Sequence, residues 1–159
     1  MRNLLIIIGL GFVLVSCDGK QVFDQYKSVS QNWKKTDSVQ FQFQTPDTIH
    51  KYNLFVNLRN NNNYEFSNLY LIVNLKAPSK KTTLDTLEYE MAKPTGEWLG
   101  KGFSVKENKL FFKENVRFKE NGKYTISITH AMRKNGNVLG EDYLKGITEV
   151  GFRIEKTSN

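Results

Sequence analysis

The only cysteine of this 159-residue chain lies at the end of an apolar run, where a thiol can become an attachment point for lipid. Residues 4–15 are apolar, follow the positive charge of Arg2, and lead into Leu14-Val15-Ser16-Cys17. A charged start, an apolar stretch of about 7–15 residues and a small residue before the cut mark a secretory signal. A thiolate is nucleophilic enough to be alkylated, and the tetrapeptide resembles a bacterial lipobox. We therefore predict a signal peptide over residues 1–16, cleavage before Cys17, and lipidation of Cys17.

The apolar run is too short to span a bilayer, which requires about 20 apolar residues, so lipid would hold the protein on the membrane. Two lipid signals suffice for stable anchoring. On this interpretation residues 17–22 form a lipidated tether and residues 23–159 form one domain. No cysteine then remains for a disulfide, and no cofactor is expected beyond the covalent lipid on Cys17. The alternative is a plain signal peptide followed by a domain with a free, buried Cys17.

Other residue types that do chemistry are few and poorly arranged for it. Glu88 and Glu90 alternate with apolar residues, so on a strand their carboxylates would lie on one face about 7 Å apart. Glycosidases use such separations, but an ordinary exposed strand face has the same pattern, and we favour that interpretation. His50 adjoins a turn, and His130 has the inward parity of a strand, which favours a core histidine over a metal ligand. Without a GxSxG motif, the sequence predicts no enzyme and no metal site.

Binding residues are expected in two stretches that lack a strand pattern. Trp98 lies among glycines, which makes its ring either a stacking platform or a plug of the core. Residues 131–147 are more than a simple connection needs, and long loops often carry function. The candidate contacts of this loop belong to the types that enrich the centres of interfaces, and they are Met132, Arg133 and Tyr143.

The same loop also has a structural interpretation. Val138, Leu139 and Leu144 would fold back over an open end of the domain, and Asn135-Gly136 would turn an internal hairpin. The sequence leaves the two interpretations open.

The elements that position these residues are predicted to be strands, because apolar and polar side chains alternate along most of the chain. Residues 39–44 alternate perfectly, and similar rows occur at 52–58, 69–75, 87–91, 110–118, 124–130 and 150–154. Seven or eight strands favour an all-β fold, a two-sheet antiparallel β-sandwich of the immunoglobulin-like or jelly-roll-like kind. A closed barrel is the alternative.

Three local features are expected within this pattern. Asn121-Gly122 is a strong signal for a hairpin turn. Glu114 breaks the parity of its row, which indicates a bulge. One set of apolar residues has the spacing of one or two helical turns, namely Phe23, Tyr26, Val29 and Trp33.

The charge of the chain favours acidic partners at a membrane. The formal net charge is +7, and it falls by one when Arg2 leaves with the signal. Such a surplus suits anionic lipid headgroups, lipopolysaccharide phosphates or an acidic protein. Nucleic acid is not expected as a partner, because the protein is exported and its basic residues form no long tract.

Segments spread over nearly the whole chain resemble the gliding motility lipoproteins called GldH. They are "YNLFVNLRNNNNYEFSNLYLIV" (residues 52–73), "GEWLGKG" (96–102), and "AMR" followed by "LKGITEVGFRIE" (131–133 and 144–155). The resemblance implies a cell-envelope lipoprotein required for surface motility and associated with the type IX secretion apparatus, whose envelope proteins would be its partners. The family's lipid-bearing cysteine matches Cys17, and no other binding residue is implied.

Two functions remain open. The favoured one is a non-catalytic, protein-binding accessory module of the motility and secretion machinery. The alternative is a binder of glycans or small ligands that uses Trp98 and Arg133. Because no acidic cluster follows Cys17, we expect the domain to face the periplasm from the outer membrane. The opposing signal is Asp18, since an aspartate directly after the lipidated cysteine marks inner-membrane retention in some other bacteria.

Overall fold

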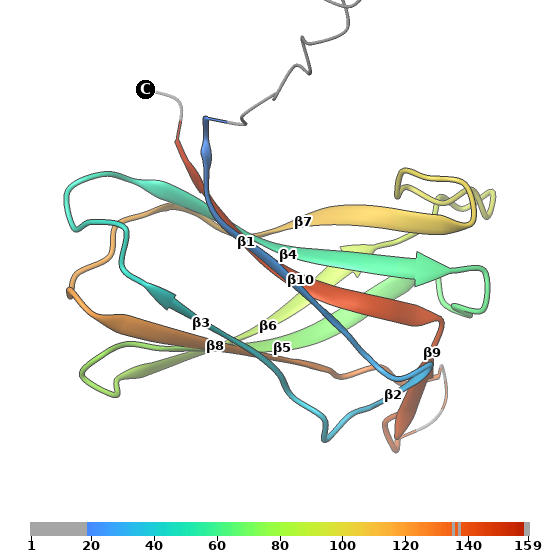
Figure 1. The fold of residues 1–159 in the computed structure, drawn as a ribbon. Helices are drawn as coiled ribbons and strands as arrows, with labels where there is room; N and C mark the ends of the chain where they lie inside the picture. Colours follow the sequence, from blue (N-terminus) through green and yellow to red (C-terminus); the bar gives the residue numbers. More distant parts are fainter. Residues whose placement is uncertain (1–18, 135, 137, 158–159) are drawn as a thin grey trace, which may run out of the picture.

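The computed structural model describes residues 19–134, 136 and 138–157, and all regular structure in this part of the chain is β-strand. The order of the strands along the chain is shown in Figure 1. Their bounds are β1 Gln21–Ser28, β2 Asn32–Lys34, β3 Val39–Gln44, β4 Tyr52–Asn61, β5 Asn68–Lys76, β6 Thr82–Glu90, β7 Val105–Val116, β8 Lys123–His130, β9 Tyr143–Lys145 and β10 Ile147–Lys156.

The strands form a two-layer antiparallel sandwich. One sheet has the order β1-β10-β4-β7, the other has the order β3-β8-β5-β6, and the short strands β2 and β9 pair separately. Figure 1 shows the two four-stranded sheets as layers facing each other. Each sheet ends in edge strands, so the closed barrel is excluded and the predicted sandwich is confirmed.

The core lies between the sheets and follows from the alternation of the sequence. In β3 the burial alternates strictly, so Val39, Phe41 and Phe43 point inward while the glutamines between them face solvent. Phe43 stacks on Tyr124 of the neighbouring strand and reaches Phe152 of the opposite sheet at 5.5 Å between ring centroids. Burying each such side chain contributes about 1.5–3 kcal/mol, and this apolar layer holds the sheets together.

The helical turns expected from Phe23 to Trp33 are absent, and that prediction is wrong. Phe23 and Tyr26 lie on β1, which pairs with β10 along its length, and Trp33 lies on β2. On a strand the odd spacing between Phe23 and Tyr26 places their side chains on opposite faces. Phe23 packs on Phe43 and Phe152, whereas the hydroxyl of Tyr26 donates to Glu107 at the surface. Pairing with β10 therefore overrides the local 3.6-residue spacing.

The hairpin expected at Asn121-Gly122 is also wrong. Strands β7 and β8, which flank this turn, belong to different sheets and do not pair. Gly122 does adopt a positive φ of 133°, but its carbonyl oxygen accepts a hydrogen bond from the main-chain nitrogen of Thr45. The turn thus carries the chain from one sheet to the other.

The bulge expected at Glu114 is confirmed. Tyr52 pairs with Val116 and Leu54 pairs with Lys113, so β7 uses one residue more than β4 over this stretch. Asn115 takes up the extra length with a φ of 54°, and its main-chain nitrogen donates to the side chain of Asn53.

The connections gather at two opposite ends of the sandwich. The end where β1 begins and β10 finishes is called the amino end. It includes residues 19–20, 45–51, 77–81, 117–122 and 157. A hydrogen bond from Lys156 to the carbonyl of Lys20 joins the two chain segments there. The groove end contains residues 29–31, 35–38, 62–67, 91–104 and 131–142, together with β2 and β9 (Figure 1).

Candidate binding groove

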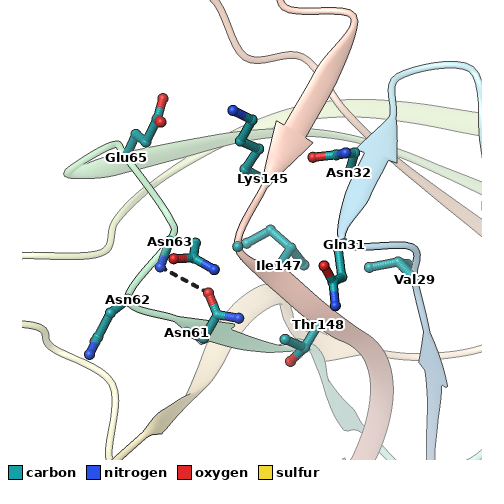
Figure 2. Close-up of a pocket in the computed structure, with 11 residues that line it drawn as sticks. Val29, Gln31, Asn32, Asn61, Asn62, Asn63, Glu65, Lys145, Ile147 and Thr148 are labelled. Carbon is teal, nitrogen blue, oxygen red and sulfur yellow. Dashed lines mark hydrogen bonds between the residues drawn. The ribbon is translucent and has the colours of Figure 1, made fainter.

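A pocket of about 600 Å³ opens at the groove end (Figure 2). It lies between the end of β1, the connection from β4 to β5, and the turn from β9 into β10. The residues that line it are Val29, Gln31, Asn32, Asn61, Asn62, Asn63, Glu65, Lys145, Gly146, Ile147 and Thr148.

The wall of the pocket is fixed by a close backbone contact. Gly146 has a φ of 82°, and a β-carbon there would lie 2.1 Å from the nitrogen of Tyr64. The carbonyl oxygen of Gly146 accepts a hydrogen bond from Asn61, and the side chain of Asn61 accepts one from the nitrogen of Asn63 (Figure 2). A glycine at this turn therefore lets the asparagine-rich connection sit directly against the β9–β10 turn.

The chemistry of this lining is dominated by amides. Gln31, Asn32, Asn61, Asn62 and Asn63 each carry both donors and an acceptor. Such side chains match groups that also donate and accept, such as the main chain of a peptide or the hydroxyls of a sugar. The sequence offered one signal for this site, the run of asparagines at residues 60–63 where β4 ends.

A second pocket, of about 490 Å³, adjoins the first and shares Glu65 and Lys145 with it. The other residues of its lining are Phe66, Lys134, Leu139, Gly140, Glu141, Asp142 and Tyr143. We call the two pockets together the groove. Val138, Leu139 and Tyr143 are 93%, 77% and 55% exposed, so apolar surface lies beside the amides of the groove.

The connection from β8 to β9 folds back on itself. The nitrogen of Glu141 donates to the carbonyl of Met132 over 2.7 Å, and Lys35 pairs with Asp142 at 2.9 Å. Leu144 is fully buried and closes the core, as the structural interpretation of this loop expected. Val138 and Leu139 do not cover the core but face solvent, so that interpretation holds for one of its three residues.

The structure separates the four described candidate contacts. Tyr143 lines the groove. Met132 is 1% exposed and its sulfur accepts a hydrogen bond from the nitrogen of Tyr70, so it belongs to the core and its prediction as a surface contact is wrong. Arg133, the next residue, is exposed.

Trp98 is half-buried and packs against the core, with its ring 6.1 Å from that of Tyr64. Trp98 lines neither pocket of the groove, and in the described part of the chain no hydrogen bond or ring contact joins it to Arg133. The predicted lipidation at Cys17 lies outside the described residues.

His130 is a core histidine, as its parity predicted. It is 2% exposed, and its Nε2 lies 3.0 Å from the carbonyl oxygen of Trp33. Because a carbonyl only accepts, Nε2 carries the hydrogen, which leaves the buried Nδ1 without a partner. Burial lowers the pKa of His130. His50, in contrast, is exposed and bonds to Asp47.

Glu88 and Glu90 lie on the exposed face of β6, as expected. Glu88 accepts a hydrogen bond from the side chain of Asn68 at 3.2 Å. A hydrogen bond from Tyr70 is the main cause that lowers the pKa of Glu88. Glu88 is therefore an exposed carboxylate that two hydrogen-bond donors keep ionised, whereas a general acid must be protonated. Over the residues that the structure describes, no three His, Cys, Asp or Glu side chains converge as metal ligands.

The outer face of the β1-β10-β4-β7 sheet carries a network that the sequence did not reveal. The guanidinium of Arg59 lies 4.3 Å from the ring centre of Tyr26 and pairs with Glu149 at 2.7 Å and with Glu107 at 3.4 Å. Its members come from four strands, so no local pattern marks them. A second cluster on this face consists of Asp24, Lys109, Arg153 and Glu155. Since acids and bases are paired, this face offers little net charge.

The fold and surface thus define a small β-sandwich domain with an open groove at one end, whose larger pocket is rich in amides. No helix within the described ranges is long and apolar enough to cross a membrane.

The chain belongs to the GldH lipoprotein family, whose model matches residues 21–154. It is 56% identical over 145 residues to a gliding motility lipoprotein GldH homolog of Christiangramia forsetii, covering 91% of this chain and 89% of that one. It is 51% identical over 157 residues to the gliding motility lipoprotein GldH of Flavobacterium johnsoniae, covering 98% of both. The family resemblance seen in the sequence is confirmed.

Solved structures resemble this domain only distantly. A GH115 4-O-methyl-α-glucuronidase, BtGH115A, aligns with a TM-score of 0.45 and 11% identity over 89% of this chain and 18% of that one. The VP2 subviral particle of infectious bursal disease virus aligns with a TM-score of 0.36 and 13% identity over 86% of this chain and 33% of that one. Similarity at this level carries no argument about function.

Proposed function

We propose that this domain is a non-catalytic, protein-binding accessory module of the gliding motility and type IX secretion machinery, held on the membrane by lipid on Cys17. The family supports the link to motility, since its two relatives above are named gliding motility lipoproteins. The observation that carries the binding role is the groove at the end of the sandwich opposite the start of β1.

The position of the groove suits a partner in the envelope. The eight residues of β1 run from the amino end toward the groove end, a distance of about 25 Å at 3.3 Å per residue. A lipid attached just before β1 would therefore leave the groove on the side of the domain away from its membrane.

The lining of the groove supports a protein segment as its ligand. Amide side chains pair with the main-chain groups of an extended segment, while the neighbouring Val138, Leu139 and Tyr143 offer apolar contact. We infer that a partner protein inserts a segment with accessible main chain and apolar side chains.

The non-catalytic assignment is supported by the placement of the candidate chemical groups. His130 is buried, Glu88 is held by two donors, and Glu65 is the only acid in the larger, amide-lined pocket. The larger pocket therefore presents a surface for recognition rather than a pair of groups for proton transfer.

The amides also suit a glycan, which keeps a glycan-binding role as the second candidate. Sugar sites generally add an aromatic platform, and Trp98 packs on the core outside the amide-lined pocket. Titration with peptidoglycan fragments separates the two candidates, because only a glycan binder responds in the absence of envelope proteins.

We further propose that the domain faces the periplasm from the outer membrane. The residues after Cys17 carry no acidic cluster of the kind that accompanies surface export. Protease added to intact cells should leave the domain uncut until the outer membrane is opened. Cleavage in intact cells would overturn this location.

The binding role is tested by affinity purification of the tagged, full-length protein from its membrane. The variant carries Leu139→Ser and Tyr143→Ala, and its control is Leu84→Ser, an exposed leucine of β6 outside the groove. We expect the groove variant to fold normally. Its recovery of co-purifying envelope proteins should fall at least about tenfold, because hot-spot side chains each contribute about 2 kcal/mol to binding. Cells that carry this variant should spread poorly on agar. Equal recovery of those proteins by the groove variant and the control would contradict the groove as the contact.

A further inference from the structure

The two ends of the sandwich differ in charge. At the amino end the connections contain two acidic residues, Asp47 and Glu120, and six basic ones, Lys20, Lys51, Lys80, Lys81, Arg117 and Lys119. At the groove end, the connections contain five basic and five acidic residues, and Lys34 of β2 and Lys145 of β9 bring this end to seven basic residues against Asp37, Glu65, Glu97, Glu141 and Asp142. The positive surplus of the connections is therefore gathered at the end from which the chain continues toward Cys17.

Two of these bases, together with Lys156 at the end of β10, line one pocket of about 490 Å³ at the amino end. Lys51 comes from the residue before β4, Arg117 from the residue after β7, and Lys156 from the end of β10. All three are exposed, and none makes an ion pair with another residue of the described part of the chain. A pocket lined by three bases that pair with no acid of the described part of the chain attracts an anion.

The two acids of this end are held by hydrogen bonds from other residues. Asp47 accepts them from the main-chain nitrogens of Ile49 and His50, two residues that line the pocket, at 2.8 Å, and from the hydroxyl of Tyr52, and its carboxylate also lies 2.8 Å from Nδ1 of His50. Glu120 accepts from the nitrogen and the hydroxyl of Ser79 at 2.9 and 2.8 Å. These bonds fix the connections and hold the two carboxylates on other donors, so the three bases of the pocket are open to an external anion.

The chemistry of the pocket selects a phosphate. Arg117 offers a planar fork of donors, and Lys51 and Lys156 offer point charges, a combination that suits the several oxygens of a phosphate group. Ile49, which is 72% exposed, lines the same pocket and adds an apolar contact. A phosphate that carries an apolar body would satisfy both kinds of side chain.

The lipid anchor brings such a phosphate within reach. Only residues 18–20 separate Cys17 from the start of β1. Four Cα–Cα steps of about 3.3–3.6 Å each span at most about 14 Å, which is less than twice the Debye length of about 8–10 Å over which surface charge acts. With lipid on Cys17, as in the proposed function on which this step rests, the amino end lies against the headgroups.

We propose that the pocket of Lys51, Arg117 and Lys156 binds the phosphate of an anionic lipid headgroup in the leaflet that holds the anchor. This contact orients the sandwich with its amino end on the membrane and its groove directed away from it.

The test uses the acylated, full-length protein in vesicles of phosphatidylcholine alone or of an equal mixture with phosphatidylglycerol. An amine-reactive label reports the exposure of Lys51 and Lys156, with Lys101 at the groove end as the internal control. Each base near an anionic surface contributes about 1 kcal/mol, or about fivefold in occupancy. We expect phosphatidylglycerol to slow labelling of Lys51 and Lys156 at least about fivefold and to leave Lys101 unchanged.

Arg117→Gln removes one base without removing a labelled amine, so it should restore most of the labelling of Lys51 and Lys156. Arg133→Gln, its control at the groove end, should not. Protection in neutral vesicles on addition of inorganic phosphate alone would assign the pocket to a free phosphate and overturn the lipid assignment. Equal labelling in both vesicles would overturn the headgroup contact alone, whereas a protein that floats with neither vesicle would overturn the anchor as well.

Discussion

Gly146 lies directly against the main chain of Tyr64, with no room between them for a β-carbon. This contact joins the β9–β10 turn to the connection after β4, and these two segments form most of the wall of the larger pocket of the groove. The shape of the groove therefore depends on one residue without a side chain.

We predict that Gly146→Ala destabilises the protein by at least about 2 kcal/mol, because alanine meets both the steric contact and the strain of a positive φ. Gly96→Ala is the matched control, since Gly96 has nearly the same φ, 84°, with open space around it. The control should cost about 1 kcal/mol. Urea denaturation of both variants measures the difference, and equal losses would show that the contact with Tyr64 has no energetic weight.

Met132 and Arg133 are neighbours with opposite expected roles. Met132→Ala removes a fully buried side chain and the acceptor of the Tyr70 nitrogen, so it should lower the free energy of unfolding by about 2–4 kcal/mol. Arg133→Ala should change it by less than about 0.5 kcal/mol, because the side chain is exposed, yet it should weaken recovery of envelope partners. An Arg133→Ala protein that melts several degrees earlier would make Arg133 a structural residue.

The stability of the protein should fall as the pH drops from about 7.5 to 5.5. Burial lowers the pKa of His130 below its usual 6.5, so the unfolded chain takes up the proton before the folded one does, and uptake favours unfolding. We expect a loss of about 1 kcal/mol over this range. His130→Gln keeps a donor for the carbonyl of Trp33 and should flatten this part of the curve. An unchanged slope in the variant would exclude His130 as its source.

Cys17 should carry lipid. Metabolic labelling with a palmitate analogue is expected to mark the wild type and not Cys17→Ala, because the apolar run ends at this residue and the chain has no second thiol. The variant should also lose its membrane association on fractionation. An unlabelled wild type would contradict the anchor and the orientation built on it.

Much of the fold could be read from the sequence, because a strand has a period of two and one buried face. The strict alternation of residues 39–44 determined both the strand and its inward side chains, and the parity of His130 placed it in the core. The broken parity at Glu114 similarly marked a bulge. In each case the signal lies within a few adjacent residues.

The tertiary structure decided everything that depends on which distant segments meet. Asn121-Gly122 has the local conformation of a turn, but only the packing of two sheets decides that β7 and β8 do not pair across it. Met132 is of a type common at interfaces, but in the folded chain it is buried. Lys51, Arg117 and Lys156 are far apart in the sequence and line one pocket only because three strand ends converge. Local periodicity fixes the direction of a side chain, whereas burial and the grouping of charges depend on contacts between residues far apart in the chain.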